Sequence, residues 1–178
     1  VLILTDDQGW GDLSRTGNTQ LATPHIDRLA LDGVVLTWFY VQPLCAPTRA
    51  ELLTGRSFTS TGVKGVTRCA ERLKLDERTL GDVFREGGYA TGCFGKWHSG
   101  MQYPYHPNGR GFDEFYGFCC GHWSHYFDST VEHNGVETRA EGYLPAALTT
   151  RAIGFMEKNR DRPFLCYVPL NTPQSPFQ

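Results

Sequence analysis

Short apolar runs alternate with amphipathic stretches along the first third of the chain. The run over residues 1–5 stops abruptly at two aspartates, which predicts a buried strand followed by a loop. Thr23 and Pro24 form an N-cap and first-turn signal, so we expect a helix that ends at Gly33. Residues 34–41 are β-branched and aromatic, which predicts a second strand that delivers the chain to Cys45.

The same alternation continues to the carboxyl end. A short helix from Cys45 ends near Gly55, and Thr79 caps a helix that ends at Gly87. A strand is expected over residues 89–94, the longest helix over 145–159, and a further strand over 164–168. Strands alternating with helices favour an α/β fold with a mostly parallel central sheet and helices on both faces.

Unusual polar residues follow the predicted strands. In open parallel sheets, ligands bind beyond the carboxyl ends of the strands, so residues in these loops are expected to face one place. The residues at these ends are Asp6 and Asp7 after the first strand, Cys45 after the second, Lys96 and His98 after the third, and Gln174 after the last.

Composition indicates one ordinary domain or part of one. The chain has 178 residues, of which 40% are hydrophobic and 20% charged. A net charge of −2 gives no general attraction to nucleic acid or anionic lipid, so any anion site must be local. No apolar run approaches the roughly 18 residues that span a bilayer, and we expect no membrane span.

Six cysteines follow neither a zinc-finger spacing nor the density of a disulfide scaffold. Cys93 and Cys166 lie in apolar runs and are expected in the core, whereas Cys69 and the adjacent Cys119 and Cys120 could be free or paired. The histidines other than His98 have no partner that the sequence can name, and we expect them near the surface: His25, His106, His122, His125 and His133.

Cys45 stands where a helix with an early proline begins, and Arg49 follows one turn later. A helix start and a guanidinium both favour anions, which suggests a nucleophile in an anion site. A cysteine of this kind can equally be a small buried apolar side chain.

Two further pairs point to the same chemistry. Asp6 and Asp7 at a buried strand end need a cation, and their hard oxygens favour calcium or magnesium, although a loop-capping role explains them as well. Lys96 and His98 lie two residues apart on an expected extended segment, which places both side chains on one side, where they suit an anionic ester. A solvated lysine and a histidine bound to backbone remain the alternative.

Together these residues resemble the type I sulfatases of the alkaline phosphatase-like superfamily. The matching motifs are strung along nearly the whole chain in family order, and the Cys45 motif with its Leu-Leu-Thr-Gly-Arg tail is highly specific. They are the segments 4–12, 23–30, 45–56, 95–98 and 111–117.

The resemblance implies that Cys45 is oxidised by a formylglycine-generating enzyme to formylglycine, whose hydrated aldehyde attacks the sulfur of a sulfate ester. It implies a divalent metal, Ca²⁺ with Mg²⁺ as the alternative, held by Asp6, Asp7 and the modified Cys45. Arg49 and Lys96 would stabilise charge on the formylglycine and sulfate, and His98 would act as base when the aldehyde re-forms. Ser124 and Gln174 would contact substrate beside Lys96.

Two departures bear on function. The family usually has histidine where this chain has Gln174, and an amide cannot act as a general acid near neutral pH. Family members also continue for several hundred residues, so residues 1–178 are expected to be the N-terminal part of the catalytic domain and inactive alone.

The parent would hydrolyse a sulfated small molecule or glycan, after export to a periplasmic, extracellular or lysosome-like compartment. A phosphonate or phosphate ester hydrolase of the same superfamily and a non-catalytic binding protein stay open as alternatives.

Overall fold

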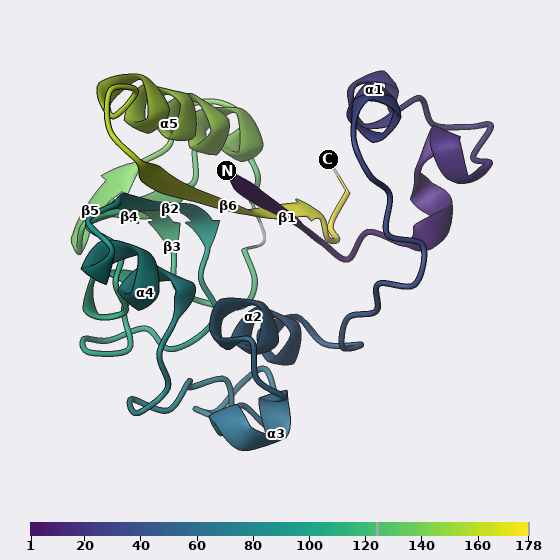
Figure 1. Cartoon of the computed structure of the whole chain (residues 1–178). Coiled ribbons are helices and arrows are strands. Elements are labelled where there is room, and N and C mark those ends of the chain that lie inside the picture. The colour runs from purple at the N-terminus through teal and green to yellow at the C-terminus, as the bar shows by residue number, and fades with distance from the viewer. Residues whose placement is uncertain (124, 178) are drawn as a thin grey trace.

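A computed structural model of the chain describes residues 1–123 and 125–177, and it contains a six-stranded sheet (Figure 1). In chain order the strands are β1 (Leu2–Asp6), β2 (Ala90–Lys96), β3 (Glu114–Phe118), β4 (Thr130–His133), β5 (Val136–Arg139) and β6 (Phe164–Pro173). Their order across the sheet is β1-β6-β2-β3-β4-β5. The pairs from β1 to β3 are parallel, whereas β3–β4 and β4–β5 are antiparallel. The predicted α/β class with a mostly parallel sheet is confirmed.

Five α-helices and three 3₁₀ turns are assigned within the described residues. The helices are α1 (Pro24–Asp32), α2 (Cys45–Thr54), α3 (Phe58–Thr61), α4 (Leu80–Glu86) and α5 (Leu144–Lys158). The 3₁₀ turns are η1 (Trp10–Asp12), η2 (Ser14–Thr16) and η3 (Pro107–Gly109). Helix α5 covers one face of the sheet, while α2 and α4 lie on the other (Figure 1).

Each face of the sheet carries its own apolar core, because successive strand residues point to opposite faces. Phe94 and Cys166 pack with Leu148 and Phe155 of α5 on one side. On the other side, Cys93 and Tyr167 pack with a cluster that includes Leu53 of α2 and Trp97. The expectation that Cys93 and Cys166 are core residues is therefore confirmed, and all six cysteines are free thiols.

The helix that begins after Thr79 shows how local sequence determines an element here. The Thr79 hydroxyl accepts from the backbone N–H of Asp82, whose carboxylate accepts in return from the N–H of Thr79. This capping box satisfies two N–H groups at the helix start, and the predicted helix is confirmed.

The strand predicted over residues 34–41 was wrong: this segment has no strand assignment. Its apolar side chains are exposed, among them Val34 at 88% and Trp38 at 81%. A β-branched and aromatic run becomes a strand only where a neighbouring strand is available, and among residues 1–123 and 125–177 this segment pairs with no strand and leaves its apolar side chains exposed. Cys45 therefore does not follow a strand.

Strands β3, β4 and β5 were not predicted. The turn between β4 and β5 consists of Asn134 and Gly135, both with positive φ. An Asn-Gly pair between short alternating runs is a strong hairpin signal, and it could have identified β4 and β5 from sequence.

Candidate active site

Three neighbouring parallel strands bring Asp6, Lys96 and Gln174 together. Asp6 ends β1, Lys96 ends β2, and Gln174 directly follows β6, which lies between the two. The ammonium of Lys96 donates to Oδ2 of Asp6 at 2.5 Å and to Oε1 of Gln174 at 3.0 Å. Lys96 is fully buried and Asp6 is 3% exposed, so this ion pair lies in a largely dry environment.

Arg49 of α2 also belongs to this network. Its Nη2 donates to Oδ1 of Asp6 at 3.2 Å and to the carbonyl of Leu170 at 3.4 Å. Its Nη1 donates to the carbonyl of Lys96 at 2.8 Å, and the side chain is buried. Two cations thus share one carboxylate, which leaves one excess positive charge in the buried cluster.

Cys45 is the first residue of α2, with Leu44 as its N-cap. The thiol residue is half-buried and lines a pocket of about 390 Å³ together with Asp6, Asp7 and Arg49. The first N–H groups of a helix lack partners within the helix and carry the positive end of its dipole. The pocket is therefore lined by the start of a helix, two carboxylates and a buried guanidinium.

Asp7 is exposed and has a φ of 59°, in the left-handed region, so the chain turns sharply after Asp6. Both carboxylates line the pocket. They offer the hard oxygen ligands that Ca²⁺ and Mg²⁺ prefer, but two residues cannot supply the six to eight oxygens of a calcium site. Within residues 1–123 and 125–177, the donor atoms of Asp6, Asp7 and Cys45 do not form a compact three-ligand group. The residues present therefore fit part of a divalent cation site.

His98 is buried, and its backbone has a φ of 57°. The extended geometry assumed for Lys96 and His98 was therefore wrong at His98, because the strand ends at Lys96 and the chain turns. The two side chains also bind different partners. Nε2 of His98 lies 2.8 Å from the carbonyl of Val66 and must donate to it.

The imidazole of His98 is held neutral with a free basic nitrogen. Since Nε2 carries the proton, Nδ1 is the unprotonated atom, and it is buried without a partner among the described residues. The pKa of His98 is lowered to about 4, chiefly by burial and also by the positive charges of Lys96 and Arg49, while the hydrogen bond to Val66 opposes the shift.

The remaining predicted residues are placed less decisively. Gln174 is held at its backbone, where its carbonyl accepts from the hydroxyl of Tyr126. Ser124 lies outside the described residues. His25, His122 and His125 are exposed as expected. The prediction for His106 was wrong, since it is 7% exposed and pairs with Glu132.

Sequence reasoning missed the groups that hold His98. Besides the Val66 carbonyl, Gly121 packs directly on the ring: a Cβ at residue 121 would lie 2.2 Å from Nε2 of His98. A glycine is needed at this close approach, but nothing in the local sequence links residue 121 to residue 98.

The family follows from comparison with known proteins. The sulfatase family model matches residues 1–178. The chain belongs to the sulfatase family. Arylsulfatase G of Canis lupus familiaris is 43% identical over 126 residues, which cover 68% of this chain and 23% of that protein. The chain thus spans about a quarter of the length of this sulfatase relative.

Solved structures of other proteins share the fold. The crystal structure of Ps i-CgsB in complex with k-i-k-neocarrahexaose has a TM-score of 0.89 and 32% identity, covering 99% of this chain and 45% of that one. The structure of BT4656 in complex with D-glucosamine-2-N,6-O-disulfate, its substrate, has a TM-score of 0.83 and 28% identity, covering 98% and 34%. Within the described residues of this sulfatase chain, no helix is long and apolar enough to cross a membrane.

Proposed function

We propose that this sulfatase-family chain is the part of a sulfate ester hydrolase that carries the nucleophile, with Cys45 converted to formylglycine. The observation that carries the proposal is the pocket in which Cys45 starts α2 beside Asp6, Asp7 and the buried Arg49. Once formed and hydrated, formylglycine supplies an oxygen nucleophile for sulfur and a second hydroxyl for release of sulfate. The activity belongs to a chain of the length of its relatives, and residues 1–178 alone are expected to be inactive.

Arg49 and Lys96 stabilise the anion in this proposal. The buried network of Arg49, Lys96 and Asp6 has one excess positive charge. In this poorly solvated environment the charge attracts an anionic sulfuryl group more strongly than it would in water. Both cations are held in place by the carboxylate of Asp6, and Arg49 lines the pocket beside Cys45. The helix start at Cys45 adds to the same field.

His98 is the base for re-forming the aldehyde. Its Nδ1 is the free acceptor, and the lowered pKa keeps the ring neutral near pH 7. The carbonyl of Val66 holds the ring in the tautomer that leaves Nδ1 unprotonated, so Nδ1 is the atom that would accept the proton in this proposal.

Asp6 and Asp7 are the residues that would hold Ca²⁺, or Mg²⁺, with the modified Cys45 as a further ligand. A bound divalent ion would supply positive charge to the sulfate oxygens. The other oxygen ligands would come from the part of the relatives that this chain does not span.

Gln174 sets a limit on the leaving group. Its Oε1 accepts from Lys96, so the amide is oriented at the site but donates no proton as an acid. We expect preference for esters with good leaving groups, such as aryl sulfates, over alkyl sulfates. Gln174→His should raise turnover of alkyl sulfates most. Equal rates on both esters, with no gain from Gln174→His, would refute this role.

The substrate we propose is a sulfated small molecule or glycan, in keeping with the disulfated glucosamine that BT4656 binds. A formylglycine-generating enzyme is the maturation partner, and an exported or lysosome-like location is the proposed compartment. Paired assays on a sulfate and a phosphonate ester of the same phenol separate sulfatase from phosphonate hydrolase activity.

Mass spectrometry of the peptide that contains Cys45 is the decisive test. The protein is co-expressed with a formylglycine-generating enzyme, and the peptide should show conversion of the CH₂–SH side chain to an aldehyde. Cys69→Ser, at an exposed thiol, is the matched control and should leave conversion unchanged. An unmodified thiol at residue 45 throughout would favour the non-catalytic binding protein.

A further inference from the structure

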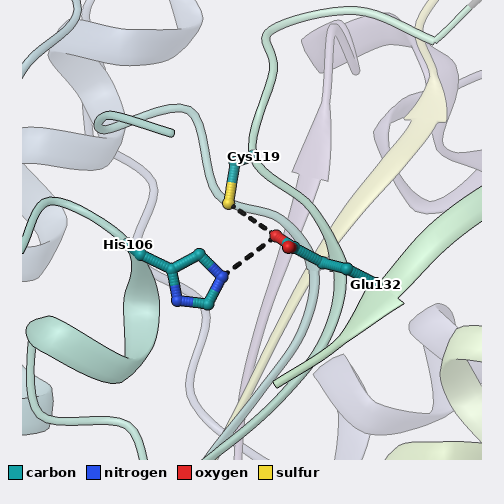
Figure 2. Close-up of side chains that lie close together, drawn as sticks. All are labelled: His106, Cys119 and Glu132. Atoms are coloured by element: carbon teal, nitrogen blue, oxygen red, sulfur yellow. Dashed lines mark hydrogen bonds and ion pairs between the residues drawn. The ribbon is translucent and has the colours of Figure 1, made fainter. Parts of the chain in front are cut away.

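Three side chains from separate segments meet at a second place in the molecule (Figure 2). His106 precedes η3, Cys119 follows β3, and Glu132 lies on β4. Oε1 of Glu132 lies 3.0 Å from Nε2 of His106 and 3.0 Å from Sγ of Cys119. Among residues 1–123 and 125–177, this is the one group of three His, Cys, Asp or Glu donor atoms that all lie within 4.8 Å of one another.

The group is shielded from solvent. Cys119 is 8% exposed and the side chain of Glu132 is 26% exposed. Nδ1 of His106 accepts from the backbone N–H of Asn108 at 3.2 Å, so Nε2 carries the proton and donates it to Glu132. The thiol of Cys119 donates to the same oxygen. Two protons therefore hold the three donor atoms together.

The protonation states follow from this arrangement. Burial raises the pKa of the Cys119 thiol, and the hydrogen bond and charge of Glu132 raise it further. Burial also raises the pKa of Glu132, but the hydrogen bonds from His106 and Cys119 outweigh it and leave that pKa lowered. The group thus consists of a carboxylate, a neutral imidazole and a thiol.

We propose that His106, Cys119 and Glu132 form a binding site for a zinc-type divalent cation. Thiolate sulfur, imidazole nitrogen and carboxylate oxygen are all zinc ligands. Their bond lengths place neighbouring ligand atoms about 3.3–3.6 Å apart in a tetrahedron, so the observed 3.0 Å contacts need to open only slightly. One thiolate and one carboxylate also balance a divalent charge.

Binding releases one proton for each ion. The thiol proton leaves, while the imidazole proton moves from Nε2 to Nδ1 and ends the contact with Asn108. A pocket of about 360 Å³ lies against Cys119 and Glu132, so water from it completes four-coordination. The ion ties together η3, the turn after β3, and strand β4.

That turn also supports His98. The carbonyl of Cys119 accepts from the backbone N–H of His98 at 3.3 Å, and Gly121 packs on the imidazole. The proposed ion therefore anchors the segment against which His98 lies. The site shares no ligand with the proposed active site, and its test does not depend on sulfatase activity.

Titration of the whole chain with Co²⁺, after treatment with a chelator and reductant, tests the proposal. We expect one equivalent of four-coordinate Co²⁺ with a thiolate charge-transfer band, and displacement by Zn²⁺. Cys119→Ser should abolish that band, and Glu132→Gln should weaken binding at least tenfold. The control variants Cys45→Ser and Cys120→Ser should retain the charge-transfer band. Far-UV circular dichroism checks that each variant is folded.

Several results would overturn the proposal. They are absence of the band in the unaltered chain, its persistence in Cys119→Ser, and its loss in Cys45→Ser or Cys120→Ser. Because one proton leaves a thiol of raised pKa, the apparent affinity for Zn²⁺ should rise about tenfold for each pH unit near neutrality. An affinity independent of pH would contradict the proposed protonation states. If Cys119→Ser fails to fold, Glu132→Gln and the pH dependence decide.

Discussion

Replacing Asp6 by asparagine removes the single carboxylate that Arg49 and Lys96 share. Asparagine keeps the size of the side chain, so the change is mainly one of charge. Its amide oxygen can accept from one cation, and the other then faces an amide N–H group. Lys96 and Arg49 are fully or nearly fully buried, so water does not compensate the loss.

Loss of one partner of a buried ion pair costs about 3–5 kcal/mol. The two contacts of Asp6, at 2.5 Å to Lys96 and 3.2 Å to Arg49, place the expected loss within that range. Since domains unfold with about 5–15 kcal/mol, Asp6→Asn should remove a large part of the stability. Asp7→Asn is the matched control: this neighbour is exposed, and we expect a change of about 0.5 kcal/mol or less.

Urea unfolding in the presence of a chelator measures both variants without a contribution from bound metal. The midpoint should fall for Asp6→Asn while the slope with urea stays unchanged. Adding Lys96→Met to Asp6→Asn should restore at least about 1 kcal/mol of the lost free energy of unfolding, because it removes a cation left without its partner. Equal midpoints for Asp6→Asn and Asp7→Asn, or strictly additive losses in the double variant, would refute the argument.

Three further predictions concern His98, Thr79 and Gly121. The pKa of His98 is lowered from about 6.5 to about 4 on folding, so its contribution to the free energy of unfolding is fully present above pH 6.5. As the pH falls toward 4, the free energy of unfolding should decrease by about 3 kcal/mol in all. The urea midpoint should show this decrease, and His98→Gln should make it smaller. Thr79→Ala removes a fully buried N-cap and should cost about 2 kcal/mol by urea unfolding, with Thr79→Ser recovering most of it. Gly121→Ala should lower the free energy of unfolding by about 1–3 kcal/mol, because the new Cβ would meet the His98 ring. Gly154→Ala in α5 is the control: its Cβ meets nothing within 4 Å, and it should stabilise the protein slightly. Equal effects of the two alanines would contradict the packing of residue 121 on His98.

Much of the architecture was predictable where a local signal coincides with a packing requirement. The first helix, with Pro24 after Thr23, and the helix capped by Thr79 have their signals within a few residues, and both formed as expected. The segment 34–41 carries an equally strong strand propensity but has no neighbouring strand within the part of the chain that the structure describes, so the prediction failed.

The candidate site divides in the same way. The residue types at the strand ends were visible in sequence, because apolar runs stop at Asp6 and Lys96 and Gln174 follows the last strand. The partners were not visible. The contact between Lys96 and Asp6 spans 90 positions, and that between Arg49 and Asp6 spans 43. No local pattern encodes which carboxylate a buried cation will meet.

The sequence by itself determined the family, the α/β class and the placement of Asp6, Lys96 and Gln174 at the carboxyl ends of strands. Only the tertiary structure decided the charge balance around Asp6, the free nitrogen of His98 and the meeting of His106, Cys119 and Glu132. The physical reason is that propensity and capping act over a few residues. Burial and electrostatic pairing, in contrast, depend on which distant segments the sheet order brings side by side.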